Sequence, residues 1–320
     1  MRMRTLGTTG MLAAILAAGL ALPSAATAAP ATAGRTAEVS TNALAGVGGS
    51  VQTALFGKGD QHSRGKSGGL SAVGLTDGGR ALVVFSVDKP GRTGQPMTVT
   101  GLAGDRILIG IDHRVQNGKL YAVGNAGGIY LIGDRAAAAK VGQLSVALSG
   151  TQFGVDFNPA ANALRVVSDT GQNLRQPFGT GDAPNGATVA DTPLSNAGAP
   201  ATGISAAAYT NNDLSAATAT TLFDLDTVAD QVVLQSPANA GTLVPTGSYG
   251  VDADRDAGFD IYSTLRDDRA VENTGFATIT IKGRSTLVEI DLLTGSAESK
   301  GVFSQRIVTD IAVLLNQRGR

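Results

Sequence analysis

Short runs of alternating apolar and polar residues fill the chain from Leu70 onward, and Gly, Asn, Asp and Pro separate them. The clearest set comprises residues 107–114 (ILIGIDHR), 119–124 (KLYAVG), 129–134 (IYLIGD) and 139–145 (AKVGQLS). Asn117-Gly118 lies between the first two runs, and Asn-Gly in that position is a strong signal for a β-hairpin. Because alternation with a period of two is typical of half-buried strands, the set predicts one four-stranded antiparallel unit.

Similar sets of runs follow one another, with first strands at residues 153–159, 204–211 and 258–263. Their spacing of about 45 to 55 residues is typical of propellers and solenoids. The run 307–315 (IVTDIAVLL) looks like a first strand without its hairpin, and residues 70–102 look like later strands without a first. Joining these two ends completes a fifth unit, so we predict an all-β, five-bladed propeller-like domain closed by the C-terminal strand. Six blades or an irregular sandwich are the alternatives.

An aspartate recurs at one position of the first strand in four of the five units. Aligning the strands places Asp112, Asp156, Asp260 and Asp310 in one register, with Ala208 in the remaining unit. If the first strands line a central channel, these carboxylates converge on the axis and form a candidate site for a cation or for sugar hydroxyls. The other interpretation is that each carboxylate accepts backbone N–H bonds from a neighbouring blade.

The N-terminus has the features of a secretory signal peptide. Arg2 and Arg4 precede a short apolar run, and Ala26-Thr27-Ala28 fits the A-x-A cleavage pattern, with the cut after Ala28. The run is shorter than the about 20 residues that span a bilayer. We therefore predict a signal peptide over 1–28, a flexible Ala/Gly-rich leader over 29–69 and the propeller-like domain over 70–320, secreted to the extracellular space without a membrane span.

Composition supports this interpretation and excludes some partners. The chain has no cysteine, so an exported domain must be held by its core or by closure of the ring rather than by disulfides. Its 25 Lys and Arg nearly balance 26 Asp and Glu. Without a basic patch, the sequence does not indicate a nucleic acid partner.

Several longer stretches resemble the bacterial secreted family known as domain of unknown function 4394 (DUF4394). The resemblance is carried by residues 153–175 (FGVDFNPAANALRVVSDTGQNLR), 204–213 (ISAAAYTNND), 219–243 (ATTLFDLDTVADQVVLQSPANAGTL) and 250–262 (GVDADRDAGFDIY). It implies a propeller-like extracellular domain, and it implies no activity because the family has none assigned.

The most motif-like acidic segment is DADRDAGFD. Asp252, Asp254, Asp256 and Asp260 stand at positions 1, 3, 5 and 9, a spacing that presents hard oxygen ligands, as calcium requires. The glycine, Gly258, comes one place late and position 12 lacks the bidentate Glu of an EF-hand. Calcium is the candidate ion, and a solvated acidic turn is the alternative.

Polar side chains on predicted loops form a third candidate site. They are Asp169, Gln172, Asn173 and Arg175 in one unit and Tyr209, Asn211 and Asn212 in the next. Such side chains suit the recognition of polar ligands, and they equally suit Asx-turns and hydrogen bonds between blades.

The sequence contains no recognisable catalytic constellation. Only His62 and His113 are present, and His113 is expected at a strand end near an exposed turn. We therefore expect a monomeric, secreted binding or scaffold module for a small-molecule, glycan or protein ligand. An extracellular hydrolase or lyase using the channel carboxylates, and a structural protein of the cell envelope, are the alternatives.

Overall fold

The computed structural model describes residues 69–316, and in this part of the chain nearly all regular structure is β-strand. Two 3-10 helices occur there, η2 (Asp134–Ala136) and η3 (Ala238–Ala240). None of the described helices is long and apolar enough to cross a membrane. The predicted signal peptide and the predicted leader up to residue 68 lie outside the described residues.

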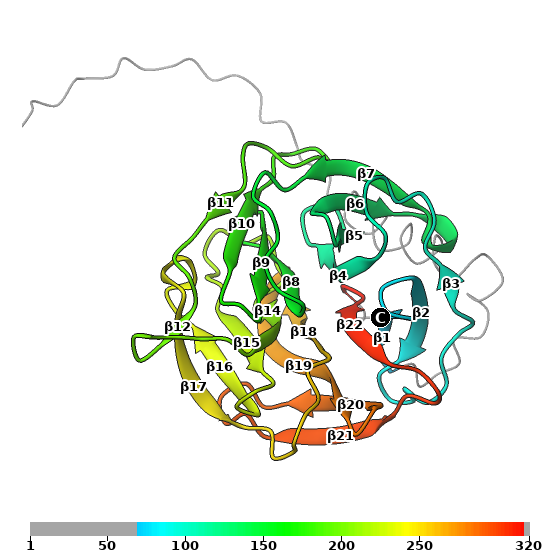
Figure 1. Ribbon diagram of the computed structural model, residues 1–320, viewed down its shortest axis with the longest axis vertical. Helices are drawn as coiled ribbons and strands as arrows, with labels where there is room; N and C mark the ends of the chain where they lie inside the picture. Colours follow the sequence, from blue (N-terminus) through cyan, green and yellow to red (C-terminus); the bar gives the residue numbers. More distant parts are fainter. Residues whose placement is uncertain (1–68, 317–320) are drawn as a thin grey trace, which may run out of the picture. The chain divides into compact units, whose positions relative to one another are not determined.

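Five small antiparallel sheets form a five-bladed β-propeller, which confirms the predicted fold (Figure 1). Blade 1 contains β22 (Val308–Val313), β1 (Ser71–Thr76), β2 (Ala81–Ser86) and β3 (Met97–Thr98). Blade 2 contains β4 (Leu108–Arg114), β5 (Lys119–Gly124), β6 (Gly128–Ile132) and β7 (Ala138–Gln143). Blade 3 contains β8 (Phe153–Asn158), β9 (Ala163–Ser168), β10 (Asn173–Pro177) and β11 (Val189–Ala190).

The last two blades are larger. Blade 4 contains β14 (Ile204–Tyr209), β15 (Leu222–Asp226), β16 (Gln231–Gln235) and β17 (Thr242–Ser248), and the short strands β12 (Ser195–Asn196) and β13 (Ala199–Pro200) extend its outer edge. Blade 5 contains β18 (Ala257–Arg266), β19 (Arg269–Ile281), β20 (Arg284–Ile290) and β21 (Ala297–Val302). Blades 2, 3 and 5 are each a meander from an inner to an outer strand, and so is blade 4 apart from β12 and β13.

The two ends of the described chain meet in blade 1, as the sequence predicts. The strand β22 pairs antiparallel with β1, with Ala72 opposite Val313 and Gly74 opposite Ile311. The inner strands contact one another in the cyclic order β22, β4, β8, β14 and β18 (Figure 1). Closure by a single strand therefore completes the ring and protects the inner edge of every sheet.

The hydrophobic core lies between the blades. Among the described residues there are five clusters, and each fills the junction between two neighbouring blades. Because both faces of each blade are covered, an inner or second strand is buried on both sides; all six residues of β9 are buried. Burial of apolar area at five junctions supplies stabilisation that many smaller domains obtain from disulfides.

Glycine allows the inner strands to approach closely. A Cβ on Gly258 would lie 2.4 Å from the Cα of Asp310, and one on Gly154 would lie 2.5 Å from the backbone nitrogen of Ala207. No larger residue fits at either position without moving the neighbouring strand. These glycines stand two residues before Asp260 and Asp156, so the close approach positions the aspartates next to the following blade.

The hairpin of β18 and β19 is longer than the sequence predicts. The predicted strands cover 258–263 and 276–282, whereas the pairing continues to Arg266 opposite Arg269. The next strand, β20, ends at Ile290 opposite Gly275, so the end of the hairpin projects beyond its own blade. This projecting part is largely exposed and polar, and it therefore lacks the apolar alternation that marks a buried strand.

We expect the closing strand to be essential to stability. Ile311→Ala removes a side chain that is 1% exposed, so it should lower the free energy of unfolding by about 2–5 kcal/mol, as for other buried Ile-to-Ala changes. Val244→Ala on β17, where Val244 is 51% exposed, should change it by less than about 0.5 kcal/mol. Urea unfolding followed by circular dichroism measures both variants, and equal effects would contradict the role given to β22.

Candidate functional site

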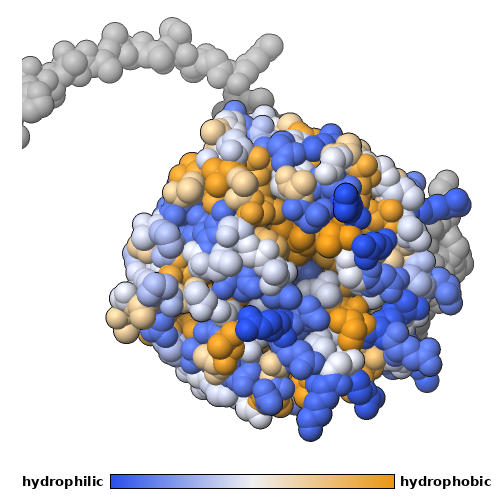
Figure 2. Space-filling model, viewed as in Figure 1, coloured by the Kyte–Doolittle hydropathy of each residue, from blue (hydrophilic) through white to orange (hydrophobic). Residues whose placement is uncertain are grey.

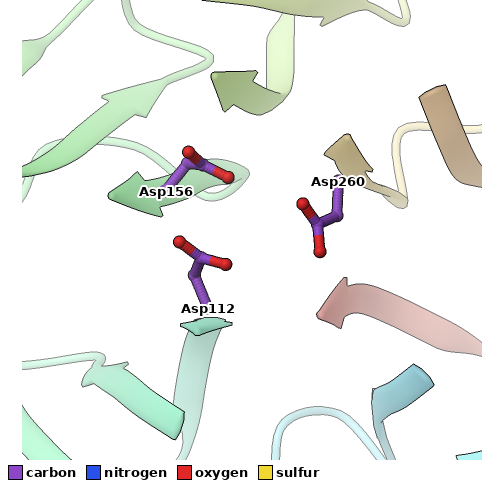
Figure 3. A group of neighbouring side chains, drawn as sticks. All are labelled: Asp112, Asp156 and Asp260. Carbon is purple, nitrogen blue, oxygen red and sulfur yellow. The ribbon is translucent and has the colours of Figure 1, made fainter. Parts of the chain in front are cut away.

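Three of the four predicted channel aspartates meet at the centre of the ring. Asp112 of β4, Asp156 of β8 and Asp260 of β18 point toward one another (Figure 3). One carboxylate oxygen of each lies within 4.8 Å of the other two, and all three residues are buried. Among the described residues this is the one group of three or more metal-ligating side chains that are this close.

We call Asp112, Asp156 and Asp260 the axial group. The carboxylate of each also accepts a backbone N–H from the next blade. The Asp112 carboxylate accepts from Phe157 N at 2.7 Å, and that of Asp156 accepts from Tyr209 N at 3.0 Å. The Asp260 carboxylate accepts from Val313 N at 2.5 Å. These bonds match the second interpretation of the aligned aspartates, in which they link neighbouring blades.

The fourth aspartate, Asp310 of β22, makes the same kind of link. Its Oδ2 accepts from Ile111 N of blade 2 at 2.7 Å. Carboxylates thus join four of the five blade junctions. The exception is the junction of blades 4 and 5, where Ala208 stands at the corresponding position of β14. This junction must be held by other contacts.

Burial controls the charge state of the axial group. Burial, followed by repulsion from Asp260, raises the pKa of Asp112 well above its ordinary value of 3.8. Burial and the neighbouring Asp112 raise the pKa of Asp156, and burial raises that of Asp310. For Asp260, burial outweighs two backbone N–H bonds and raises the pKa to about 6. Protons or a cation stabilise such a group, because three close negative charges repel one another in a medium of low dielectric.

The chemistry of the axial group suits a hard cation better than hydrolysis. A carboxylate offers about four lone pairs, so an oxygen that accepts one N–H bond can still bind a metal ion. Hydrolysis of glycosides would instead need a sugar to fit between two carboxyl groups, and these three residues are all buried. Ligand binding by these aspartates stays a prediction.

His113 is buried rather than exposed. Its side chain lies near the end of β4, as expected, but the residue is only 3% exposed and burial lowers its pKa to about 4. In the described part of the protein neither ring nitrogen has a hydrogen-bond partner, so no serine or carboxylate is oriented by it. This geometry does not support a triad built on His113.

The structure separates the four aspartates of the predicted calcium segment. Asp260 lies in the axial group, whereas Asp252 and Asp254 are exposed ahead of β18. Asp254 Oδ2 accepts the Gly283 N–H at 2.8 Å, and Asp256 Oδ1 accepts from Gln152 Nε2 at 3.4 Å. The first of these bonds explains part of the acidic pattern as support for the β19–β20 turn, and the second links Asp256 to the segment before β8. Calcium binding by Asp252, Asp254 and Asp256 stays a prediction.

The polar residues predicted in blade 3 divide into two groups. Asp169 and Gln172 support the loop before β8, because Asp169 accepts from Thr151 and Gln172 bonds to Ser149 and Ala147. Asn173 and Arg175 lie farther along, where Arg175 pairs with Asp191 at 3.0 Å. All four side chains make internal contacts.

Asn173 belongs to a buried polar network that the sequence did not reveal. The guanidinium of Arg165, on β9, pairs with Asp191 at 2.8 Å and also donates to Asn173, Asn239 and the hydroxyl of Tyr209. Burial alone would raise the pKa of Asp191, but hydrogen bonds from Arg175 and Arg165 outweigh it and lower the pKa. Tyr209 therefore serves the junction of blades 3 and 4.

Asn211, Asn212 and Asp213 hold the junction that lacks an axial carboxylate. Asn211 exchanges two hydrogen bonds with Asn273 of β19, at 2.9 and 2.7 Å. Asn212 binds Ser263 Oγ and the Ile261 carbonyl, both at 2.9 Å. Asp213 Oδ2 accepts the Ala270 N–H at 2.8 Å. This short segment fastens the projecting hairpin to blade 4.

A cleft of about 700 Å³ lies at this junction. Blade 4 contributes Thr210, Asn211, Thr221 and Phe223. Blade 5 contributes the remaining lining residues, which are Val271, Glu272, Asn273, Thr274, Glu289, Ile290, Asp291, Leu292, Leu293, Ser296, Ala297 and Glu298. The cleft has room for a ligand because the hairpin projects past the end of β20, and its volume is in the range of ligand sites.

The view in Figure 2 separates the surface into two regions. Apolar residues gather in its upper part, over the blades of β4–β7 and β8–β11, and hydrophilic residues predominate in the lower part, over blade 5.

Comparison with known proteins gives a family but no activity. A family model described as a domain of unknown function (DUF4394) matches residues 81–312. None of the curated proteins matches the chain.

Similar solved structures include an auxiliary nutrient binding protein from Bacteroides thetaiotaomicron, with 13% identity and a TM-score of 0.36, covering 72% of this chain and 58% of that one. A protein of unknown function from the same organism has 12% identity and a TM-score of 0.42, covering 77% and 67%. A nidogen/laminin complex has 9% identity and a TM-score of 0.40, covering 78% and 99%. The chain thus spans less than two thirds of the length of the nutrient binding protein.

The raised pKa of Asp260 predicts that this residue stabilises the fold more at low pH. Because the folded-state pKa is about 6 against an ordinary value of 3.8, the folded protein holds this proton more tightly than the unfolded chain does. That stabilisation is present below about pH 4 and is lost as the pH rises to about 6. Asp260→Asn keeps an acceptor for Val313 N but cannot titrate. Between about pH 4 and 7, the wild type should lose up to about 3 kcal/mol relative to this variant. Urea unfolding in chelator measures the difference, and parallel pH profiles would contradict the prediction.

The calcium hypothesis predicts a higher midpoint of thermal unfolding in excess calcium than in chelator, because an ion that binds only the folded state stabilises it. Asp254→Asn keeps an acceptor for the Gly283 N–H but loses its charge, so it should abolish the rise. Asp134→Asn, at an exposed acidic residue of blade 2, should retain it. A rise that survives in Asp254→Asn but disappears in Asp260→Asn would assign calcium to the axial group. No rise in the wild type would remove calcium from both sites.

Proposed function

The chain belongs to the DUF4394 family, and from the geometry of its propeller we propose that it is an exported module that binds a ligand without transforming it. The observation that carries the proposal is the cleft of about 700 Å³ between blades 4 and 5. Its lining combines apolar side chains with amide, hydroxyl and carboxylate groups, the mixture that fixes and orients a bound ligand.

The side chains of the other polar clusters are engaged in contacts within the protein, which favours the cleft as the binding site. The axial aspartates link blades, and Arg165 is enclosed in the junction of blades 3 and 4. Of the predicted loop residues, Asn211 is the one that lines the cleft. Export is supported by the signal-peptide features of residues 1–28 and suits a domain without cysteine.

Blocking the cleft tests the proposal. The protein is expressed from its full sequence and recovered from the medium, with Ala29 expected as its first residue. Its midpoint of thermal unfolding is then measured with a panel of glycans, peptides and small metabolites. At least one class should raise the midpoint, and Ser296→Trp should abolish the rise because Ser296 is exposed and lines the cleft.

Thr98→Trp is the matched control, because it adds the same side chain at an exposed position on β3 of blade 1. It should leave ligand stabilisation unchanged. Stabilisation that survives in Ser296→Trp would place the ligand elsewhere, and chemical conversion of a stabilising compound would favour the hydrolase alternative. Protein retained inside the cell with residues 1–28 attached would contradict export.

A further inference from the structure

The charges of the cleft are all of one sign. Its lining includes four carboxylates, Glu272, Glu289, Asp291 and Glu298, and no Lys, Arg or His. The whole chain, by contrast, has nearly equal numbers of acidic and basic residues. Lys300 pairs with Glu289 at 3.1 Å. Glu272 and Glu298 are exposed, and neither takes part in an ion pair with another residue of the described part of the chain.

Two of these carboxylates have structural roles that separate them from the others. Asp291 accepts the backbone N–H groups of Leu293 and Thr294, which shape the β20–β21 turn and lower the pKa of its side chain. Glu289 is held by Lys300. Glu272 and Glu298 belong to different strands, β19 and β21, and both line the cleft, so each can attract a positive charge that enters it.

The cleft also exposes large apolar side chains. Leu293 is 79% exposed and Val271 is 52% exposed, and both line the cleft. Leu214 is 50% exposed and follows Asp213, which binds the backbone of Ala270 next to Val271. Half of the six large hydrophobic residues that are most exposed in the described chain therefore lie at or beside this cleft. Apolar side chains gathered at a concave surface are typical of interaction sites.

Carboxylates beside exposed apolar side chains restrict the chemistry of the occupant. A sugar offers neither a positive charge nor a large apolar group, and a simple polyamine offers only the charge. A peptide with Lys or Arg next to Leu, Ile or Val offers both. We propose that the cleft binds a short basic and apolar segment of a partner protein, with its basic side chains near Glu272 and Glu298 and its apolar side chains against Val271 and Leu293. This inference rests on the proposed function and names the ligand class of the same cleft.

The experiment measures fluorescence anisotropy with a labelled eight-residue peptide of alternating Lys and Leu. A Glu/Leu peptide of the same pattern and spermine serve as the comparison ligands. The Lys/Leu peptide should bind the wild type, and salt should weaken binding because the charges are exposed. The Glu/Leu peptide should not bind, and spermine should compete at least about tenfold less well, since it lacks the apolar contacts.

The variants locate the binding. Glu272→Gln with Glu298→Gln should weaken the affinity about tenfold, because two exposed ion pairs are lost. Leu293→Ser should weaken it with no change in salt dependence. Asp77→Asn with Asp134→Asn, which removes the same charge from exposed positions in blades 1 and 2, should change the affinity less than about twofold.

If the two double variants weaken peptide binding equally, the peptide is attracted by net charge alone. If spermine binds as tightly as the Lys/Leu peptide, the ligand is a small polyamine. Either result overturns the inference. The inference would also be overturned if a glycan or metabolite binds the wild type but not Ser296→Trp, and the Lys/Leu peptide does not bind. That result would leave the proposed function intact. If no compound or peptide binds in the cleft, both the proposed function and this inference are overturned.

Discussion

The structure depends on the hydrogen bond between an aspartate of one inner strand and a backbone N–H of the next blade. The inner strands of neighbouring blades do not pair as a continuous sheet, so their N–H groups need other acceptors. Asp112, Asp156, Asp260 and Asp310 supply these acceptors at four junctions. The same bonds bring carboxylates together at the axis. Burial raises their pKa values and so favours the protonated form, which reduces the repulsion between them.

The one junction without this link is also the one with the cleft. Ala208 cannot bridge blades 4 and 5 at the axis, and Asn211, Asn212 and Asp213 hold them together at the base of the projecting hairpin instead. At this junction, the polar contacts between the blades therefore lie on the hairpin rather than at the axis. Four junctions are polar at the centre and serve stability, whereas the fifth is polar at the surface, where a ligand can reach it.

Much of the fold follows from the sequence because each blade is local. Alternation and Asn-Gly turns mark the strands, and the incomplete units at the two ends predict closure by residues 307–315. The register of the aspartates also follows, since it depends on strand periodicity alone. The ends of β18 and β19 could not be predicted from the sequence, because a projecting hairpin has no buried face to produce an alternation of apolar and polar residues. Nor did the burial of His113 and Arg165, because alternation shows which face a residue occupies but not what packs against that face. The cleft depends on how far the β18–β19 hairpin extends past β20, so its carboxylates are scattered between Glu272 and Glu298 with no motif.

The position of β22 has a consequence for the order in which the protein acquires its structure. Thr76 Oγ1 donates to the carbonyl of Ile307, a partner 231 residues away along the chain. Blades 2 to 5 are each built from one continuous segment of the chain, but the first blade needs the last strand. Ring assembly is therefore a late step with a high entropic barrier, and folding rates fall as such distant contacts become more important. Until residues 308–313 are available to pair with β1, the ring stays open between blades 5 and 2.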